Sequence, residues 1–316
     1  MEGILFQFQE KQKFSLLKRF LYLIFILLVS HSCNKNDEEV QVKESVWTTK
    51  SFNYKHDGLV RSYILYKPQN FKKNSPLVFV LHGFGSSSLN IMSYSQMNLI
   101  AEENGFMVCY PQGSILPTGQ SHWNANLEMS SVDDIGFLSN LAKEVQTIYQ
   151  INPKNIFVSG MSNGGFMSYT LACEKSDVFK AIASITGTMS GKDWENCNPS
   201  FDIPVMQISG TNDRTVPWDG TMSTAYGWGG APHIKQVVEF WADQNQCDVD
   251  QKINFPDIDI SDKSTVSLLK KKGSLKNNQV WFYTVDGGGH DWPGSWGNKD
   301  ISATKEIWKF FSHHLK

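Results

Sequence analysis

The segment IFVSGMSNGGFMSYTLACE (residues 156–174) decides the fold of this chain. Its apolar start, residues 156–160, predicts a buried strand, and residues 164–173 predict a helix that opens on small side chains. Between them Ser162 stands on a sharp strand-to-helix turn, in the pattern Gly-x-Ser-x-Gly. Such a turn pushes the serine out of the sheet, and glycines flank it because larger side chains would collide there. Ser162 is therefore a candidate nucleophile.

Two further strand ends carry the residues that complete a catalytic triad. PVMQISGTNDRTVPW (204–218) is an apolar run followed by a polar loop with Asp213, and VWFYTVDGGGHDWPG (280–294) ends in a glycine-rich turn with His290. Serine, then aspartate, then histidine is the chain order of α/β-hydrolases and differs from the best-known serine protease orders. PLVFVLHGFG (76–85) predicts another buried strand, followed by a loop that matches the second oxyanion-hole donor of that fold.

The identity of the triad acid has alternatives. Asp219 lies in the same loop as Asp213, and Asp202 precedes the strand, so both compete with Asp213 on position alone. Asp133 and Asp134 precede the serine, which is the wrong chain order. They fit the start of a helix predicted over 135–149, where carboxylates interact favourably with the helix dipole.

The other candidates also have structural alternatives. Ser162 has the alternative of an ordinary turn serine, and His290 that of a solvated loop histidine. His82 is interpreted as structural, with the backbone amides of its loop as the useful atoms. Four independent elements nevertheless agree: the serine turn, the acid loop, the histidine loop and the oxyanion loop. Together they favour a serine hydrolase.

Strand and helix patterns alternate over most of the chain. The strands 46–54 and 59–68 form a predicted hairpin that turns at residues 56–58. Further strands are predicted over 77–81, 106–110, 156–160, 181–185, 205–209 and 280–285, and helices over 90–104, 135–149, 164–173, 235–244 and 303–313. This alternation predicts the α/β class, an α/β-hydrolase fold with a mostly parallel central sheet and helices on both faces. The lysine-rich residues 248–278 are expected to form surface loop or short strands.

The motifs resemble a known family. VDDIGFLSNLAKEVQTIYQINPKNIFVSGMSNGGFMSYTLACE, SGTNDRTVPWDG, VVEFWADQNQC and GGGHDWPG are similar to the polyhydroxybutyrate depolymerase and feruloyl esterase group of secreted α/β-hydrolases, related to the first carbohydrate esterase family. The resemblance covers most of residues 60–316. It implies that Ser162 is the nucleophile, Asp213 the triad acid and His290 the base, with backbone amides of Phe84 and Asn163 in the oxyanion hole. It implies ester hydrolysis, usually of acyl groups on plant polysaccharide or of polyesters.

The N-terminal residues 1–33 predict an export segment. Basic residues precede the apolar run 20–29, which is too short to span a bilayer and suits a signal-peptide core. Cys33 follows this region and resembles a bacterial lipoprotein cleavage site, which predicts a lipid anchor on that cysteine. Because Ser30 stands where leucine is usual, ordinary signal-peptidase cleavage stays open. Residues 34–45 predict a flexible tether, whose acidic start resembles surface-export tags, and 46–316 the catalytic domain. An outer-membrane or cell-surface lipoprotein is therefore expected, with a periplasmic or extracellular protein as the alternative.

Cysteine usage fits an exported protein. The chain has five cysteines, and if Cys33 is lipidated the remaining four allow three full pairings. Cys109 lies inside an apolar strand and is interpreted as a buried free thiol. The family resemblance implies a disulfide between Cys173 and Cys197, since both match family cysteine positions. It leaves Cys247 unpaired, because this chain has no cysteine at the position of its usual partner.

Composition narrows the function classes. The 41% hydrophobic and 19% charged fractions are those of a globular domain. The net charge of −2 becomes −4 without residues 1–33, which hold four basic and two acidic residues, so no nucleic-acid partner is expected. No CxxC or HExxH spacing occurs, and we expect neither metal nor cofactor.

Three tryptophans are candidate substrate-binding residues. Trp218 and Trp292 lie shortly after the triad acid and histidine, and Trp123 lies in a loop. Indoles near a catalytic loop can stack on sugars or aromatic acyl groups, whereas core packing is the alternative for each. They favour an acyl or feruloyl ester on plant polysaccharide over a polyhydroxybutyrate ester. A catalytically inactive glycan-binding lipoprotein is the alternative from another class, since fold alone does not prove chemistry.

Overall fold

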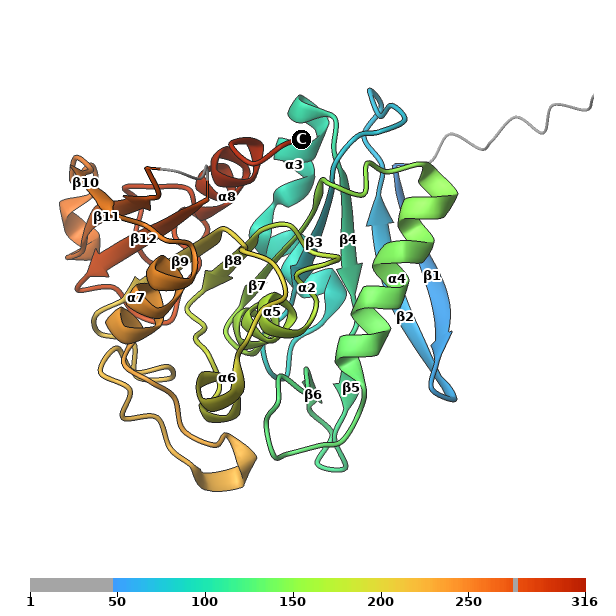
Figure 1. Cartoon of the computed structure of the whole chain (residues 1–316), viewed down its shortest axis with the longest axis horizontal. Helices are drawn as coiled ribbons and strands as arrows, with labels where there is room; N and C mark the ends of the chain where they lie inside the picture. The colour runs from blue at the N-terminus through green and yellow to red at the C-terminus, as the bar shows by residue number, and fades with distance from the viewer. Residues whose placement is uncertain (1–47, 275–277) are drawn as a thin grey trace, which may run out of the picture. The chain divides into compact units, whose positions relative to one another are not determined.

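A ten-stranded sheet runs through the described part of the chain, residues 48–274 and 278–316 of the computed structural model (Figure 1). The strands are β1 (Thr49–His56), β2 (Leu59–Tyr66), β3 (Leu77–Leu81), β4 (Met107–Pro111), β7 (Ile156–Met161), β8 (Ile182–Ile185), β9 (Val205–Gly210), β10 (Val249–Asn254), β11 (Thr265–Lys272) and β12 (Gln279–Asp286). Their order is β1-β2-β4-β3-β7-β8-β9-β12-β11-β10. From β4 to β12 neighbouring strands are parallel, and an antiparallel pair flanks them at each edge. The short strands β5 (Ser114–Ile115) and β6 (Ser121–His122) pair separately.

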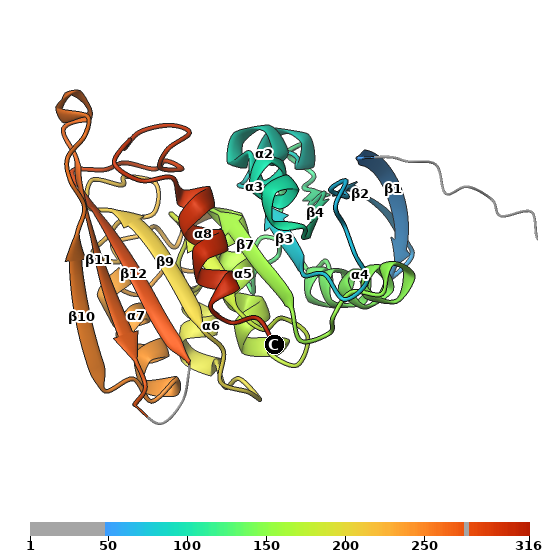
Figure 2. The same cartoon turned by 90° about the horizontal axis from the view of Figure 1, so that it is seen from above.

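Helices cover both faces of the sheet (Figures 1 and 2). One face packs against α4 (Asp134–Tyr149), α5 (Asn163–Glu174) and α7 (Ile234–Gln244). The other packs against α2 (Ser88–Ser95), α3 (Met97–Asn104) and α8 (Ala303–Ser312). The remaining helices are α6 (Gly191–Asn196), η1 (Ala225–Gly227) and η2 (Ile260–Asp262). The prediction of a mostly parallel sheet with helices on both faces is confirmed.

The buried strand β3 shows why the core has two halves. All five of its residues are buried, and they alternate between the two faces of the sheet. Leu77, Phe79 and Leu81 belong to one apolar cluster, while Val78 and Val80 belong to the other. Successive side chains of a strand point to opposite faces, so a continuous apolar run is the pattern of a strand covered on both sides.

The single helix predicted over 90–104 is wrong, because the structure has two helices there. Gln96 separates α2 from α3 and has a left-handed backbone, with φ 52°. Its N–H donates to the carbonyl of Met92, which closes α2, and the Ser95 hydroxyl accepts from the N–H of Met97. The chain therefore turns at Gln96 while its apolar periodicity continues.

The polar residues 248–278 extend the sheet. β10 and β11 form an antiparallel hairpin, and β11 pairs with β12. Val266 and Leu268 of β11 are buried, whereas β10 is exposed at the edge of the sheet. In the described ranges, no helix is both long and apolar enough to cross a bilayer. The predicted signal segment (1–33) and tether (34–45) lie outside the described residues.

Candidate active site

Ser162 occupies the turn between β7 and α5. Its φ of 54° and ψ of −121° place a residue with a side chain in a strained backbone region, a feature that clusters at active sites. The turn is tight because backbones touch around it. A Cβ on Gly160 would collide with the carbonyl oxygen of Gly164, and one on Gly164 would collide with that of Leu81. The two glycines therefore let the serine stand at the start of α5.

Asp213 and His290 form a hydrogen-bonded pair at the ends of β9 and β12. The carboxylate oxygen Oδ2 lies 2.7 Å from Nδ1 of the imidazole. The other oxygen, Oδ1, accepts from the N–H groups of Thr215 (2.8 Å) and Val216 (2.9 Å). The side chain of Asp213 is 2% exposed and that of His290 22% exposed. A carboxylate fixed in this way keeps the proton on Nδ1, so Nε2 is left to accept one from a neighbouring hydroxyl.

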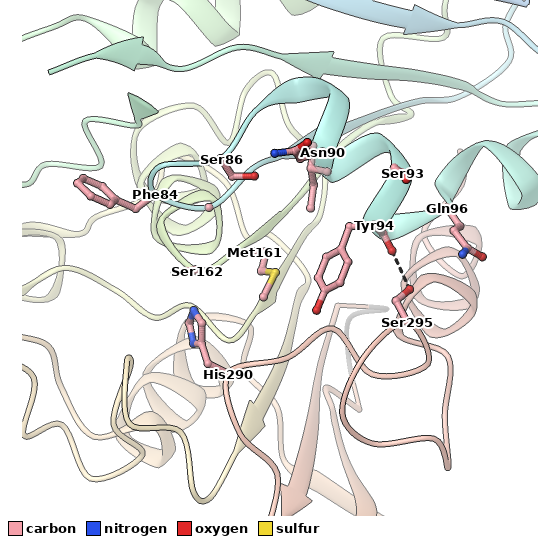
Figure 3. A pocket seen from close by; sticks show the side chains of 12 residues that line it. Phe84, Ser86, Asn90, Ser93, Tyr94, Gln96, Met161, Ser162, His290 and Ser295 are labelled. Atoms are coloured by element: carbon pink, nitrogen blue, oxygen red, sulfur yellow. Dashed lines mark hydrogen bonds between the residues drawn. The ribbon is translucent and has the colours of Figure 1, made fainter. Parts of the chain in front are cut away.

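Ser162 and His290 line the same cavity of about 590 Å³, drawn in Figure 3. Its other walls carry no acidic or basic side chain and consist of Gly83, Phe84, Ser86, Asn90, Ile91, Ser93, Tyr94, Gln96, Met161 and Ser295. No hydrogen bond between the described residues joins the Ser162 hydroxyl to the His290 ring. Such bonds commonly tighten only when substrate is in place.

Two backbone amides near Ser162 are available as donors. Asn163 is the first residue of α5, where N–H groups have no acceptor within the helix and the helix dipole is positive. The N–H of Phe84 donates to no acceptor among the described residues. A Cβ on the neighbouring Gly83 would lie 3.4 Å from Cβ of Ser162, so this loop approaches the serine closely. The two amides are the ones predicted for an oxyanion hole.

A buried hydrogen-bond network holds these two amides in place. The Asn163 side chain accepts from the Trp123 N–H (2.7 Å) and donates to the Trp123 carbonyl (3.0 Å), and the indole N–H donates to the His82 carbonyl (2.9 Å). His82 Nε2 accepts from the N–H of Gly113 (2.9 Å), so Nδ1 carries the proton and donates to the Gly83 carbonyl (2.8 Å). Burial lowers the pKa of His82 to about 4, so the ring is neutral at neutral pH.

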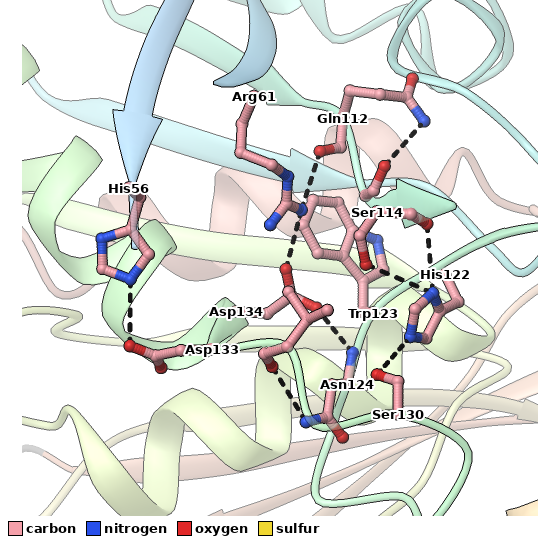
Figure 4. A network of polar contacts seen from close by, with 12 residues as sticks. His56, Arg61, Gln112, Ser114, His122, Trp123, Asn124, Ser130, Asp133 and Asp134 are labelled. Atoms are coloured by element: carbon pink, nitrogen blue, oxygen red, sulfur yellow. Dashed lines mark hydrogen bonds and ion pairs between the residues drawn. The ribbon is translucent and has the colours of Figure 1, made fainter. Parts of the chain in front are cut away.

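A buried ion pair holds the loop that contains Trp123 (Figure 4). Arg61 of β2 donates to Asp134 at 2.7 Å, and the other oxygen of Asp134 accepts from the Asn124 N–H at 2.8 Å. The guanidinium also lies 4.2 Å from the ring centroid of Phe137. Burial raises the pKa of Asp134, and the charge of Arg61 opposes this rise. Asp134 does begin α4, with Asp133 as its cap, but sequence reasoning missed the ion pair.

Comparison with known proteins gives the family. The family described as esterase PHB depolymerase matches residues 61–231, more than half of the 316-residue chain. The chain belongs to this family. The predicted resemblance to this esterase family is confirmed.

Relatives with assigned names support the family. This esterase is 29% identical to Feruloyl esterase B of Piromyces equi over 73% of its own length and 42% of that protein. It is 29% identical to an Acetylxylan esterase of Coprinopsis cinerea over 74% of its own length and 66% of that protein. The chain thus spans less than half of the Piromyces relative.

Solved structures share the fold. The acetyl xylan esterase from Aspergillus awamori superposes with a TM-score of 0.58 at 14% identity, over 84% of this chain and 99% of that one. An S-formylglutathione hydrolase from Agrobacterium tumefaciens gives 0.55 at 12% identity, over 85% and 95%. These likenesses concern the fold alone.

The three candidate tryptophans of this esterase have different surroundings. Trp123 and Trp292 are fully buried, so their prediction as substrate-binding residues is wrong. The indole N–H of Trp292 donates to the Thr304 hydroxyl at 3.0 Å, and that of Trp123 donates to the His82 carbonyl. Trp218 is half-buried and stacks on Phe282 with ring centroids 5.5 Å apart. Only Trp218 keeps an accessible face near the site.

Two more cavities adjoin the catalytic residues. Ser162 also lines a cavity of about 480 Å³, together with Arg214, Thr215, Val216, Pro217, Thr221, Met222, Ser223, Ala225, Tyr226 and Trp228. Another, of about 740 Å³, is lined by Thr211, Asn212, Asp213, Arg214, Pro217, Trp218, Asp219 and Thr221. We call them the Trp228 cavity and the Trp218 cavity. Ser162 is therefore the residue that the cavity of Figure 3 and the Trp228 cavity have in common.

The competing acids lie apart from His290. Asp219 is exposed, and its Oδ1 accepts from the N–H and hydroxyl of Thr221 at 3.1 and 2.7 Å. Asp202 precedes β9, whereas Asp213 follows it, so the two occupy opposite ends of that strand. Asp213 is thus the candidate acid that contacts the imidazole.

The cysteines of the described residues include one disulfide. It joins Cys173, near the end of α5, to Cys197, which follows α6. Cys109 is a buried free thiol, and Cys247 is free and partly buried. The disulfide links the helix that begins at Ser162 to the segment that leads into β9.

Proposed function

We propose that this esterase works by an acyl-enzyme mechanism in which Ser162 attacks the ester carbonyl. His290 takes the serine proton and returns it to the leaving alcohol, and Asp213 orients the ring and stabilises its positive charge. A water molecule, activated by His290, then releases the acid. The observation that carries the proposal is the 2.7 Å bond between Asp213 and His290, at a cavity that Ser162 shares.

The oxyanion that forms during attack is assigned to the amides of Phe84 and Asn163. Both are fixed by the network around His82 and Trp123, so little reorganisation is needed when negative charge develops on the carbonyl oxygen. Each donor is expected to stabilise the transition state by about 3 kcal/mol, as in other hydrolases from which one donor was removed.

The proposed substrates are acyl or feruloyl esters on plant polysaccharide. The names of the relatives, Feruloyl esterase B and Acetylxylan esterase, support this class. The open cavities on both sides of Ser162, lined by hydroxyl, amide and aromatic side chains, suit sugars and phenolic rings. The family description favours a second candidate, a polyhydroxybutyrate oligoester.

Covalent labelling tests the nucleophile. The full chain is treated with a fluorophosphonate probe, and the labelled peptide is identified by mass spectrometry. Labelling at Ser162 that disappears in Ser162→Ala supports the proposal, since the probe reacts only with an activated serine. Wild-type protein that hydrolyses esters but is labelled elsewhere, or not at all, contradicts it.

A substrate panel tests the ester class. Methyl ferulate, acetylated xylan oligomers and short polyhydroxybutyrate oligomers are compared by kcat/KM. We expect methyl ferulate or the acetylated xylan oligomers to give the highest kcat/KM. A preference of about tenfold, or about 1.4 kcal/mol in the transition state, for the hydroxybutyrate oligomers would favour the second candidate.

We propose further that the chain is exported and held at a membrane by a lipid on Cys33. The sequence pattern before that cysteine supports this, and Cys33→Ala is expected to release the protein from the membrane fraction without changing its specific activity. Mass spectrometry of the native protein checks the modification. An unmodified N-terminus beyond Cys33 would end the proposal.

A further inference from the structure

Arg214 is a charged residue at the site that the proposed mechanism does not use. It follows the triad acid directly in the chain and is exposed. It lines both the Trp228 cavity, which contains Ser162, and the Trp218 cavity. The two cavities also share Pro217 and Thr221, so they are adjacent. Arg214 thus shares one cavity with the nucleophile Ser162 and a second, adjacent cavity with Trp218.

The charge of Arg214 has no partner within the described part of the chain. No carboxylate there forms an ion pair with the guanidinium within 4.0 Å. Two acids belong to the same cavity wall, but both are engaged elsewhere. Asp213 accepts from two backbone amides and contacts His290, and Asp219 accepts from Thr221. The guanidinium is therefore available to a ligand.

The chemistry of the two cavities indicates what that ligand is. Among the residues that line them, Arg214 is the one with a positive charge at neutral pH. A guanidinium presents planar paired donors that match a carboxylate. In the Trp218 cavity, Trp218 presents a partly exposed indole, a surface on which a sugar ring can stack. A sugar chain with a nearby carboxylate satisfies both features at once.

We propose that Arg214 binds a carboxylate on the alcohol part of the substrate, which makes acidic oligosaccharides the favoured esters of this enzyme. The ester lies at Ser162, a uronate lies against Arg214, and a neighbouring sugar lies on Trp218. This inference rests on the proposed serine esterase function. Because Arg214 is exposed, the gain in kcat/KM is about twofold to fivefold, and it weakens with salt.

The test compares two substrates that differ in one charge. Acetylated xylo-oligosaccharides that carry a glucuronosyl branch are hydrolysed alongside the same oligosaccharides after enzymatic removal of the branch. The readout is the ratio of the two kcat/KM values for the full chain. In the wild type we expect the higher kcat/KM for the charged substrate. The ratio is expected to decrease as the salt concentration rises from about 20 mM to about 500 mM.

Variants of Arg214 change the charge stepwise. Arg214→Gln is expected to lower the ratio about threefold, Arg214→Glu to lower it further, and Arg214→Lys to keep most of it. Lys143→Gln removes one exposed charge on α4 and serves as the matched control, with an unchanged ratio. Rescue by lysine separates a charge effect from a change in loop structure.

The outcomes separate the two proposals. A wild-type ratio near one, or a ratio that is the same in all Arg214 variants, overturns this inference while the esterase assignment stands. Absence of Ser162 labelling together with absence of turnover on either substrate refutes the proposed function, and this inference with it.

Discussion

Two carboxylates of this esterase are buried against a basic side chain, and their surroundings differ. Asp134 meets Arg61 where both side chains are closed off, with 0% and 5% exposure. Asp213 meets His290, whose side chain is 22% exposed and lines the cavity with Ser162. The closed pair connects β2 to the Trp123 loop and can only stabilise. The open pair leaves one ring nitrogen for a substrate reaction.

The difference between the pairs teaches how a chain separates catalysis from support. In both, a backbone N–H also donates to the carboxylate, so the acid cannot rotate. What differs is the partner. An arginine stays charged in any protein environment, whereas an imidazole can accept a proton in one step of a reaction and release it in the next. Variants at the open pair, at the closed pair, at the buried His82 and at a third, more exposed pair test this difference.

The largest effect is expected from the open pair. Asp213→Asn keeps the shape of the side chain but removes the charge that orients the imidazole, so kcat is expected to fall about 10⁴-fold. Steady-state kinetics on methyl ferulate or 4-nitrophenyl acetate measures this. Asp219→Asn is the matched control and is expected to retain near-wild-type turnover. The reverse result would show that Asp219 is the triad acid.

Breaking the closed pair is expected to cost stability. Arg61→Leu leaves the carboxylate of Asp134 buried without its partner, which costs about 3–5 kcal/mol of unfolding free energy. The raised pKa of Asp134 gives the sign of the pH dependence. A buried acid of this kind favours the folded state when protonated, so the loss is expected to be larger at about pH 8 than at about pH 5.

Urea unfolding of Arg61→Leu and of the double variant Arg61→Leu/Asp134→Leu completes this test. The double variant removes both charges, and it is expected to recover most of the lost stability because two apolar side chains pay no desolvation cost. A double variant as unstable as Arg61→Leu would mean that packing around Phe137, and not the unpaired charge, sets the loss.

The catalytic residues were more predictable from the sequence than the buried contacts around them. The continuous apolar run at residues 77–81 predicts a strand covered on both faces, and it is β3. Ser162, Asp213 and His290 each follow such a run, and parallel strands bring their carboxyl ends to one edge of the sheet. Each catalytic residue therefore belongs to a short local motif that can be recognised in the sequence.

The supports depend on contacts that local patterns do not encode. Arg61 and Asp134 are 73 residues apart, and the sequence around either residue does not indicate that the other is its partner. Trp123 and Trp292 lie beside catalytic loops, but an indole that points inward has the same sequence neighbourhood as one that points outward. The break at Gln96 is hidden because a glutamine in a left-handed turn does not interrupt the apolar periodicity.

A smaller effect is expected at His82, which is fully buried like the Arg61 pair. Its pKa is lowered from 6.5 to about 4 by burial, so folding favours the neutral ring. This contributes up to about 3 kcal/mol of stability that is present above pH 6.5 and is lost as pH falls towards 4. His82→Gln is expected to lose less stability than wild type between about pH 7 and about pH 4.5. The unfolding free energy of both proteins is measured by urea titration at several pH values in this range. If it falls equally with pH in wild type and in His82→Gln, His82 is not the acid-sensitive group.

The smallest effect is expected where a third pair reaches the surface. His56 lies 3.0 Å from Asp133, whose side chain is 51% exposed, so water competes for the carboxylate. His56→Gln is expected to change the unfolding free energy by less than about 1 kcal/mol. Asp133→Ala removes the same contact and also the cap that accepts from the Gly136 N–H at 2.7 Å, and is expected to cost about 1 kcal/mol more. Urea unfolding of the two variants measures the difference. If His56→Gln cost as much as Asp133→Ala, the cap on Gly136 would add no stability beyond the contact with His56. If His56→Gln alone cost about 3 kcal/mol or more, as expected for the buried Arg61 pair, exposure would not explain the contrast among the three pairs.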